Sequence, residues 1–255
     1  MTGPAGRIAT WIAALKADTP TLGAVRSGAP LVAVLGASGG LGWIAGRRRP
    51  WHRRWSAPLL ALTLWVAWFF RDPPRRCPSQ QDVLYAPADG TVTAVDEVDW
   101  DWFFHGRALR FVIFLSLLDV HVTRSPVEGR LVASRRDRGG HAPAFLVRGA
   151  DRNARLLSGI VRRPRPGDQP DDRAGDRPRD RAGDRVVLAQ VVGFLARRIV
   201  PWRSPEDRVI AGQKMGLMRF GSRADVLVPA GRAVPLVAPG DRVRAGLTPL
   251  ARYRS

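Results

Sequence analysis

The sequence predicts a mainly β (α+β) protein, in which a hydrophobic helical hairpin precedes a compact domain of the β-sandwich or barrel type. Residues 28–46 and 55–70 are long apolar stretches without a charged side chain, whereas the chain beyond them consists of short β-branched segments separated by glycine and proline turns. We therefore expect an N-terminal segment (1–27), a hydrophobic hairpin (28–70) and a β domain (71–255).

The hairpin is expected to associate with a membrane. Residues 28–46 are about long enough to cross a bilayer as a helix, while residues 55–70 are slightly short for a full span. Five of the nine tryptophans lie in or beside these stretches, where a membrane–water interface favours them: Trp43, Trp51, Trp55, Trp65 and Trp68. A buried helical hairpin in a soluble core is the alternative interpretation.

Arginines flank both stretches, so the positive-inside rule does not fix the topology. They occupy much of the segment 47–54 between the stretches, and Arg71, Arg75 and Arg76 follow the second one. A shallow re-entrant hairpin thus stays open. The single cysteine, Cys77, allows no intramolecular disulfide, which fits a domain that faces the cytoplasm at the cell membrane.

The β domain is predicted from short alternating or apolar segments with turns between them. The segments are residues 82–85, 91–95, 109–116, 129–133, 144–147, 186–194, 195–200, 225–228 and 233–238. Turns are expected at residues 86–90 and at the glycines of residues 239–246. One stretch, residues 162–185, repeats Asp-Arg-Ala-Gly-Asp and has no large apolar side chain, so we expect a disordered insert there.

The chain is strongly basic. Its net charge of +19 favours a polyanionic partner, either nucleic acid or an anionic lipid surface. In the insert, acidic residues alternate with the arginines and no aromatic residue is interleaved for base stacking. We therefore expect a membrane surface and no nucleic acid as partner, with a basic nucleic-acid-binding protein as the rival interpretation.

The pair Gly221-Ser222 is the first candidate for chemistry. It lies between an apolar run and the strand-like Val-Leu-Val that follows. A turn is the simpler explanation. The alternative is self-cleavage, because a glycine in a strained conformation exposes its carbonyl to a neighbouring hydroxyl.

Asp89 and His121 are the other two candidates, and each also has a structural explanation. Asp89 belongs to a Pro-Ala-Asp-Gly turn. His121 is either a catalytic group or a satisfied core histidine, and alternation along an extended segment would place it on one face with Asp119 and Thr123.

No metal or nucleotide site is expected. One cysteine offers no CxxC pair, and there is no Walker-type loop, no GxGxxG after a strand and no GxSxG elbow. The histidines are widely scattered: His52, His105, His121 and His141.

Five motifs occur in order along the chain. They are Phe-Phe-Arg-Asp-Pro (69–73), Pro-Ala-Asp-Gly (87–90), Phe-Leu-Ser-Leu-Leu-Asp-Val-His-Val-Thr-Arg (114–124), Gly-Phe-Leu-Ala-Arg-Arg-Ile-Val (193–200), and residues 212–229 with Phe-Gly-Ser-Arg-Ala-Asp-Val. Together they closely resemble the short, membrane-associated form of phosphatidylserine decarboxylase, over about residues 28 to 250.

The resemblance implies a proenzyme that cleaves itself between Gly221 and Ser222. Attack of the Ser222 hydroxyl on the Gly221 carbonyl, followed by elimination and hydrolysis, would leave a pyruvoyl group at residue 222. An α chain (222–255) would then remain paired with a β chain (1–221) as a heterodimer. The pyruvoyl cofactor would form a Schiff base with phosphatidylserine and decarboxylate it to phosphatidylethanolamine.

The same resemblance assigns supporting roles and exposes departures. Asp89 and His121 match partners of the serine, and His121 would also return the proton after loss of carbon dioxide. Where longer members carry a second histidine this chain has Arg124, and the usual Asn-Glu-Arg is Asn153-Ala-Arg155. The sequence Phe-Gly-Ser-Arg matches the short form, whereas many members have Leu-Gly-Ser-Thr.

A membrane-tethered β-domain carrier or scaffold is the non-enzymatic alternative. Asp-Arg-Val-Arg-Ala-Gly (241–246) and the turn at Asp89-Gly90 are similar to the small biotinyl and lipoyl carrier folds. The attachment lysine is missing, because Lys214 is the only lysine of the β region and stands in no carrier-like hairpin motif.

Overall fold

The computed structural model describes residues 22–47, 51–142, 150–163, 185–193, 198–219 and 221–254, with side chains from residue 27 onward. The chain divides into two units. One covers residues 20–73 and contains two helices, and the other includes residues 74–255 and contains the strands.

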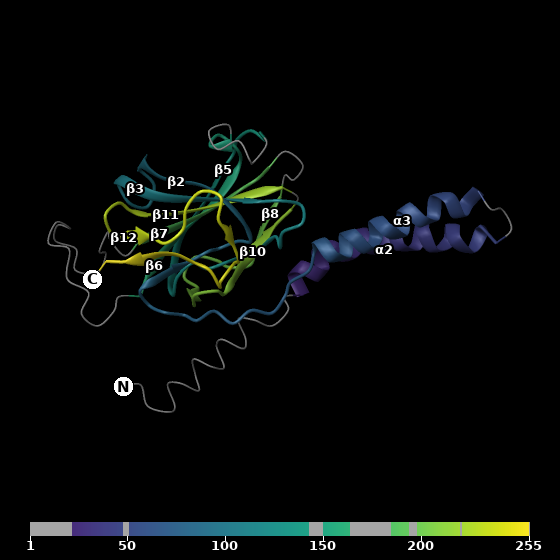
Figure 1. Ribbon diagram of the computed structural model, residues 1–255, viewed down its shortest axis with the longest axis horizontal. Coiled ribbons are helices and arrows are strands. Elements are labelled where there is room, and N and C mark those ends of the chain that lie inside the picture. The colour runs from purple at the N-terminus through teal and green to yellow at the C-terminus, as the bar shows by residue number, and fades with distance from the viewer. Residues whose placement is uncertain are drawn as a thin grey trace, which may run out of the picture. The chain divides into compact units, whose positions relative to one another are not determined.

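The two helices form an antiparallel pair (Figure 1). They are α2 (Leu22–Ala45) and α3 (Trp51–Phe69). Glycines on α2 let the backbones come close, since a Cβ at Gly39 would lie 3.0 Å from Leu60 and one at Gly42 would lie 2.5 Å from the Ser56 hydroxyl. Small residues at a helix contact are the usual means of tight packing between helices in lipid.

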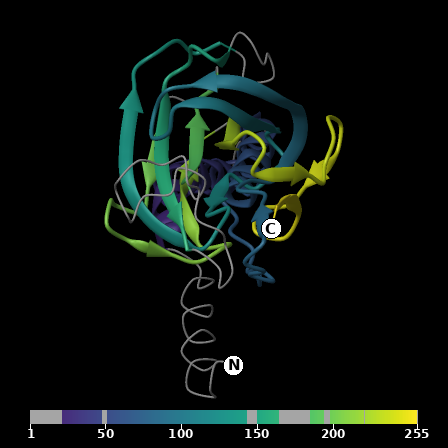
Figure 2. The same ribbon diagram turned by 90° about the vertical axis from the view of Figure 1, so that its left-hand side faces the viewer.

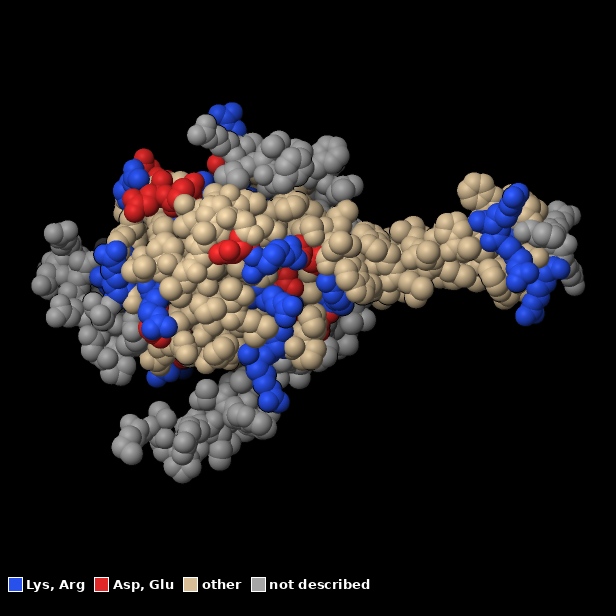
Figure 3. All heavy atoms as spheres, in the orientation of Figure 1, with Lys and Arg blue, Asp and Glu red and all other residues tan. Residues whose placement is uncertain are grey.

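The outer surface of the helical pair is apolar, which confirms the expected hydrophobic hairpin. Val34, Leu41 and Leu64 are 66%, 68% and 72% exposed. Among the described residues, Ser27–Ala45 is the one helical segment long and apolar enough to cross a membrane. At 1.5 Å per residue it spans about 28 Å, close to the thickness of a bilayer's hydrocarbon core. Charged side chains gather at the turn end of the pair (Figure 3). The apolar surface along the rest of the pair therefore favours contact with lipid.

Eight strands form one antiparallel sheet that curls around a core (Figure 2), and this confirms the mainly β prediction. In sheet order they are β13 (Arg242–Val243), β2 (Gly90–Trp100), β3 (Gly106–Leu115), β11 (Ser222–Pro229), β7 (Arg185–Val191), β6 (Arg155–Arg162), β5 (Gly129–Asp137) and β9 (Arg208–Val209).

Two sheets of three strands complete the domain. The first contains β1 (Val83–Tyr85), β14 (Pro249–Tyr253) and β12 (Ala233–Pro235), with β14 in the middle. The second contains β4 (Val122–Arg124), β10 (Lys214–Met218) and β8 (Ile199–Pro201), with β10 in the middle. This second sheet brings the histidine motif next to the segment that leads into the Gly-Ser pair.

Strand β11 is covered on both faces. Ala224, Val226 and Val228 pack in the main core, whereas Leu227 packs in a second, smaller core. Because successive side chains of a strand point to opposite faces, Ser222 shares its face with the main core. Burial on both faces also explains the continuous apolar run of β7, which lies beside β11.

Several expectations fall wholly or partly on residues that the structure does not describe. Residues 1–21 of the expected N-terminal segment (1–27) lie outside the described residues, and so do residues 194–197 of the expected segments 186–194 and 195–200. The expected strand at 144–147 lies outside the described residues, and so does most of the expected insert at 162–185. The two end residues of that insert, Arg162 and Arg185, instead belong to β6 and β7.

Candidate active site

The Gly-Ser pair lies at the start of the strand near the middle of the large sheet. Gly221 has a φ of +65°, and β11 begins at the next residue, Ser222. Ser222 is 1% exposed and pairs with Leu115 of β3. Its hydroxyl donates to the carbonyl oxygen of Arg219 over 3.4 Å. A left-handed glycine therefore directly precedes a buried serine, an arrangement that fits both the turn and the self-cleavage interpretations.

His121 lies against this pair. Its ring is fully buried, and Nδ1 is 2.9 Å from the carbonyl oxygen of Asp119. Since a carbonyl only accepts hydrogen bonds, Nδ1 carries the proton of the neutral ring. Nε2 then presents a lone pair, and it accepts a hydrogen bond from the amide N–H of Gly221 over 3.3 Å. The basic nitrogen of His121 thus faces the candidate cleavage site.

Asp119 holds the loop that orients this histidine. One carboxylate oxygen accepts hydrogen bonds from the amide and hydroxyl of Ser116 at 2.8 and 2.7 Å, and the other accepts from Arg242 at 2.7 Å. Burial by itself would raise the pKa of Asp119, but the hydrogen bonds from Ser116 and Arg242 outweigh it and lower the pKa below its ordinary value. Asp119 therefore stays charged while its carbonyl oxygen orients the ring of His121.

Backbone and side-chain hydrogen bonds join β4 to the segment before the Gly-Ser pair. The amide of Met218 donates to the carbonyl oxygen of His121 over 3.0 Å. The Thr123 hydroxyl donates to Gly216 over 3.1 Å and accepts from the amide group of Gln190 at 2.8 Å. Sequence reasoning missed Gln190, although a single polar residue within the apolar run of β7 was an available signal.

The structure does not bring Asp89 into hydrogen-bond contact with His121 or Ser222. Its carboxylate instead forms a bidentate ion pair with Arg75, with 2.7 Å between Nη2 and Oδ2. It also accepts a hydrogen bond from the amide of Ala245 over 2.8 Å. Asp89 therefore joins the chain before β1 to the C-terminal turns.

The arginine that stands where longer members have a second histidine is buried. Arg124 is 2% exposed, and its guanidinium donates to the carbonyl oxygen of Gly212 over 3.0 Å. Its amide donates to the carbonyl oxygen of Pro87 over 2.7 Å, two residues before Asp89. Arg124 thus ties β4 to the turn that carries Asp89.

The Asn-Ala-Arg departure has a packing explanation. Asn153 exchanges two hydrogen bonds with the backbone of Ala142, at 2.8 and 2.7 Å, and donates a third to the carbonyl oxygen of Val192 over 2.8 Å. Ala154 packs against the main core, where its methyl group has apolar neighbours. Asn153 therefore joins three segments of the fold, and at residue 154 the side chain packs among apolar neighbours while the backbone bonds to Gly140 and Val192.

Within the part of the chain that the structure describes, no three His, Cys, Asp or Glu side chains are grouped so that they could hold a metal ion. The contacts of the candidate site are those of Ser222 with the Arg219 carbonyl and of His121 with the backbone of Asp119 and Gly221.

Comparison with known proteins decides the family. The family model for phosphatidylserine decarboxylase matches residues 62–251. The chain belongs to the phosphatidylserine decarboxylase family. A phosphatidylserine decarboxylase proenzyme of Symbiobacterium thermophilum is 41% identical over 201 residues, which covers 79% of this chain and 85% of the relative. That of Carboxydothermus hydrogenoformans is 35% identical over 193 residues, covering 76% and 82%. That of Nitrosomonas eutropha is 36% identical over 200 residues, covering 78% and 83%.

Membership in the phosphatidylserine decarboxylase family confirms the resemblance that the five motifs indicated, and it makes the chain an enzyme. The non-enzymatic carrier interpretation is therefore wrong.

Proposed function

We propose that this phosphatidylserine decarboxylase cleaves its own chain between Gly221 and Ser222, carries a pyruvoyl group made from Ser222, and decarboxylates phosphatidylserine to phosphatidylethanolamine at a membrane. The contact between His121 and Gly221 supports the proposal most directly, because Nε2 lies 3.3 Å from the amide nitrogen of the residue whose carbonyl would be attacked. The naming of the relatives as proenzymes supports processing of the precursor.

The first step is an attack of the Ser222 hydroxyl on the carbonyl carbon of Gly221. The hydroxyl turns away from the Arg219 carbonyl oxygen that it contacts in the precursor, and His121 Nε2 takes its proton and passes it to the departing nitrogen of residue 222. The peptide bond becomes an ester, and the freed amine belongs to residue 222. Elimination then releases Gly221 as a carboxylate and leaves residue 222 dehydrated. Water next displaces the nitrogen of residue 222, which leaves as ammonia.

The residues around Ser222 fit the group that would form there. Ser222 is buried at the start of a central strand and His121 is buried beside it, so bulk water has little access to either. When present, the pyruvoyl group supplies a carbonyl that condenses with the substrate amine and accepts the electron pair left by carbon dioxide. His121 Nε2 is the group we assign to deliver the proton that completes the product.

The α chain (222–255) is proposed to remain bound to the β chain (1–221) as a heterodimer. Residues 222–229 pair with residues 108–115 of β3, and residues 223–227 pair with residues 187–191 of β7. A strand with a partner on each side keeps its backbone hydrogen bonds after the preceding bond is cut. The two chains would then separate only on unfolding.

The helical pair is proposed to hold the enzyme at the cell membrane, with the β domain facing the cytoplasm. Its exposed apolar side chains and its one helix of spanning length support this placement. Tryptophan and arginine contact each other near both ends of the pair, with Arg53 over Trp43 at 4.5 Å and Arg71 over Trp68 at 3.5 Å. Such residues favour the interfacial zone of a bilayer.

Intact-mass measurement of the purified full-length protein tests the proposal directly. We expect two chains that end at residue 221 and begin at residue 222, with the smaller one blocked at its N-terminus. We also expect carbon dioxide release from phosphatidylserine in vesicles. A single uncleaved chain after prolonged incubation would overturn the pyruvoyl assignment.

A further inference from the structure

We propose that Arg223 and Asp151 are positioning residues, which form a clamp between the two chains and hold the reactive N-terminus at residue 222 in place after cleavage. This inference rests on the proposed function. It assigns a role in the reaction to an ion-pair network on the face of β11 opposite Ser222.

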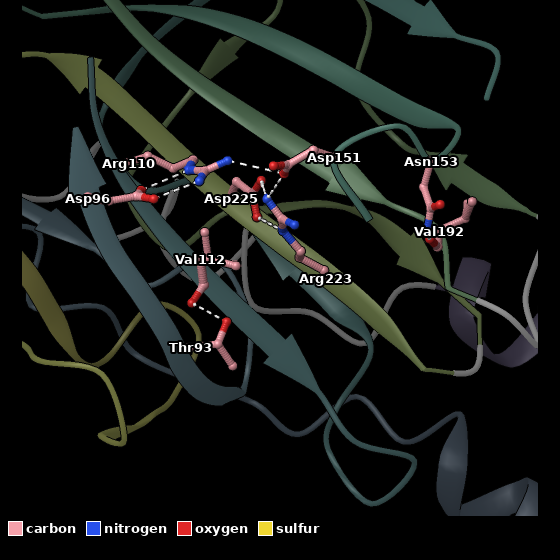
Figure 4. Close-up of polar contacts among 9 residues, drawn as sticks. All are labelled: Thr93, Asp96, Arg110, Val112, Asp151, Asn153, Val192, Arg223 and Asp225. Atoms are coloured by element: carbon pink, nitrogen blue, oxygen red, sulfur yellow. Dashed lines mark hydrogen bonds and ion pairs between the residues drawn. The ribbon is translucent and has the colours of Figure 1, made fainter. Parts of the chain in front are cut away.

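Arg223 is the residue next to the candidate pyruvoyl position, and it is 1% exposed. Two of its nitrogens contact the carboxylate of Asp225, each over 2.6 Å, and one of them also contacts Asp151 over 2.7 Å (Figure 4). A charge buried this deeply is costly unless it is paired and hydrogen-bonded. Burial alone would lower the pKa of Arg223, but Asp225 and Asp151 more than reverse this effect and raise it, so the guanidinium stays charged.

The network continues from Asp151 into neighbouring strands. Asp151 also accepts a hydrogen bond from Arg110 of β3 over 3.1 Å. Arg110 in turn binds both carboxylate oxygens of Asp96 on β2, at 2.9 and 2.7 Å (Figure 4). Bidentate arginine–carboxylate pairs fix direction as well as distance. Arg223 is thus oriented by groups that are themselves held on the sheet.

Cleavage would divide this network between the two chains. Arg223 and Asp225 would belong to the α chain, whereas Asp151, Arg110 and Asp96 would belong to the β chain. The contact between Arg223 and Asp151 would then join the residue directly after the cofactor, in the α chain, to the β chain. It would be the side-chain tie nearest to the new terminus within this network.

Residue 222 needs such a tie because the backbone ladder is incomplete there. Among the described residues Ser222 pairs with β3 only, whereas pairing with β7 begins at Arg223. In the precursor the chain before Ser222 also restrains it, and that restraint is lost when the bond is cut. Chain termini are poorly ordered unless they are tied down, and a reacting carbonyl must be held within a fraction of an ångström of its productive position.

The experiment compares Asp151→Ala and Asp151→Asn with Asp137→Ala in the full-length protein. Asp137 is a matched control, because it also contacts two arginines, Arg135 and Arg155, and its side chain is 24% exposed against 38% for Asp151. It lies on β5 and makes no contact with Arg223 among the described residues. Measurements are precursor cleavage, kcat and KM per mole of cleaved chain, melting temperature, and hydrogen exchange of the peptide that begins at residue 222.

For Asp151→Ala we expect normal precursor cleavage, an unchanged KM and a kcat reduced about tenfold, as for the loss of one charged hydrogen bond. Hydrogen exchange should quicken most in the α-chain N-terminal peptide, and in no strand other than β3, whose Arg110 also loses its contact with Asp151. Asp151→Asn should be intermediate, because its amide still reaches Arg223 without the charge. Asp137→Ala should keep the wild-type kcat, and both alanine variants should melt within about 3 °C of each other.

Three results would overturn the inference. They are an unchanged kcat in Asp151→Ala, an equal loss of kcat in Asp137→Ala, or a loss of kcat that is proportional to the fall in melting temperature across the variants. Arg223→Lys gives a second test, because lysine keeps the charge but cannot bridge two carboxylates with a planar fork. It should lower kcat and leave cleavage intact. A wild-type precursor that does not cleave would instead contradict the proposed function itself, and the clamp with it.

Discussion

Nε2 of His121 lies 3.3 Å from the amide nitrogen of Gly221, so the histidine accepts a hydrogen bond from the residue whose carbonyl is expected to be attacked. The other ring nitrogen is bound to the backbone of Asp119. These two contacts fix both the tautomer and the direction of the ring, and they lead to the first prediction.

His121→Ala should slow self-cleavage about 100-fold or more, since a positioned general base contributes at least that factor. His121→Gln is the matched variant, because it can keep the hydrogen bonds but not the basicity. Both should be compared by the rate at which full-length chain disappears on a denaturing gel. Cleavage of either variant at the wild-type rate would remove His121 from the mechanism.

Ser222→Ala should abolish both cleavage and decarboxylation, because it removes the attacking hydroxyl, and without the ester that this hydroxyl forms residue 222 cannot undergo elimination to the pyruvoyl precursor. The variant should stay folded, since Ser222 lies in an apolar core with one long hydrogen bond. Circular dichroism checks the fold. Carbon dioxide release by Ser222→Ala would show that the cofactor assignment is wrong.

Gly221→Ala should slow cleavage and destabilise the precursor by about 1 kcal/mol, because alanine is strained at a φ of +65°. Gly231→Ala is the control, since its φ is +78° and a Cβ at either glycine would meet no described neighbour within 4 Å. It should show a similar loss in the free energy of unfolding with wild-type cleavage. Equal cleavage rates in both variants would show that the conformation of Gly221 does not assist the reaction.

Asp89 and Arg75 should be coupled by about 1–3 kcal/mol in a double-mutant cycle of unfolding free energies, because each is the main partner of the other. If Asp89 also serves self-cleavage, as we predict, Asp89→Asn should slow cleavage more than Arg75→Ala does at equal stability. Identical cleavage rates at equal stability would leave Asp89 a purely structural role.

Acid should destabilise the loop that orients His121. The pKa of Asp119 is lower in the folded protein than in the unfolded chain, so this residue stabilises the fold above its ordinary pKa of about 3.9 and loses that effect as the pH falls through its folded value. Asp119→Asn should therefore be less stable than wild type at neutral pH and lose less stability on acidification. Urea unfolding between neutral pH and about pH 2 measures the difference.

The hydrophobic hairpin is predicted by composition and periodicity alone, because a helix in contact with lipid is specified by its own length and apolar surface. The predominance of β-strands after the hairpin also follows from the local pattern of apolar and turn-forming residues. Residues 91–95 and 225–228 read as strands because β-branched side chains alternate or cluster there between glycine and proline turns. The motif order around His121 and Ser222 was enough to indicate the family.

Other strands were not visible in the sequence. Residues 155–162 form β6 beside the repetitive insert, residues 214–218 form β10 before the Gly-Ser pair, and residues 249–253 form β14 near the C-terminus. Each of these strands is stabilised by partners that are distant in sequence. Local propensity carries little information about such pairing.

Tertiary structure decided how the candidate residues meet. His121 and Gly221 are a hundred positions apart, and the pairings of β4 with β10 and of β3 with β11 bring them together. Asp89 is directed to Arg75 rather than to the histidine, and Arg223 is paired with Asp151 in the turn before β6. The sequence by itself determined which groups are available for chemistry, because residue type and motif order are local properties. Which of them touch depends on long-range sheet register, and that is set by the packing of the whole domain.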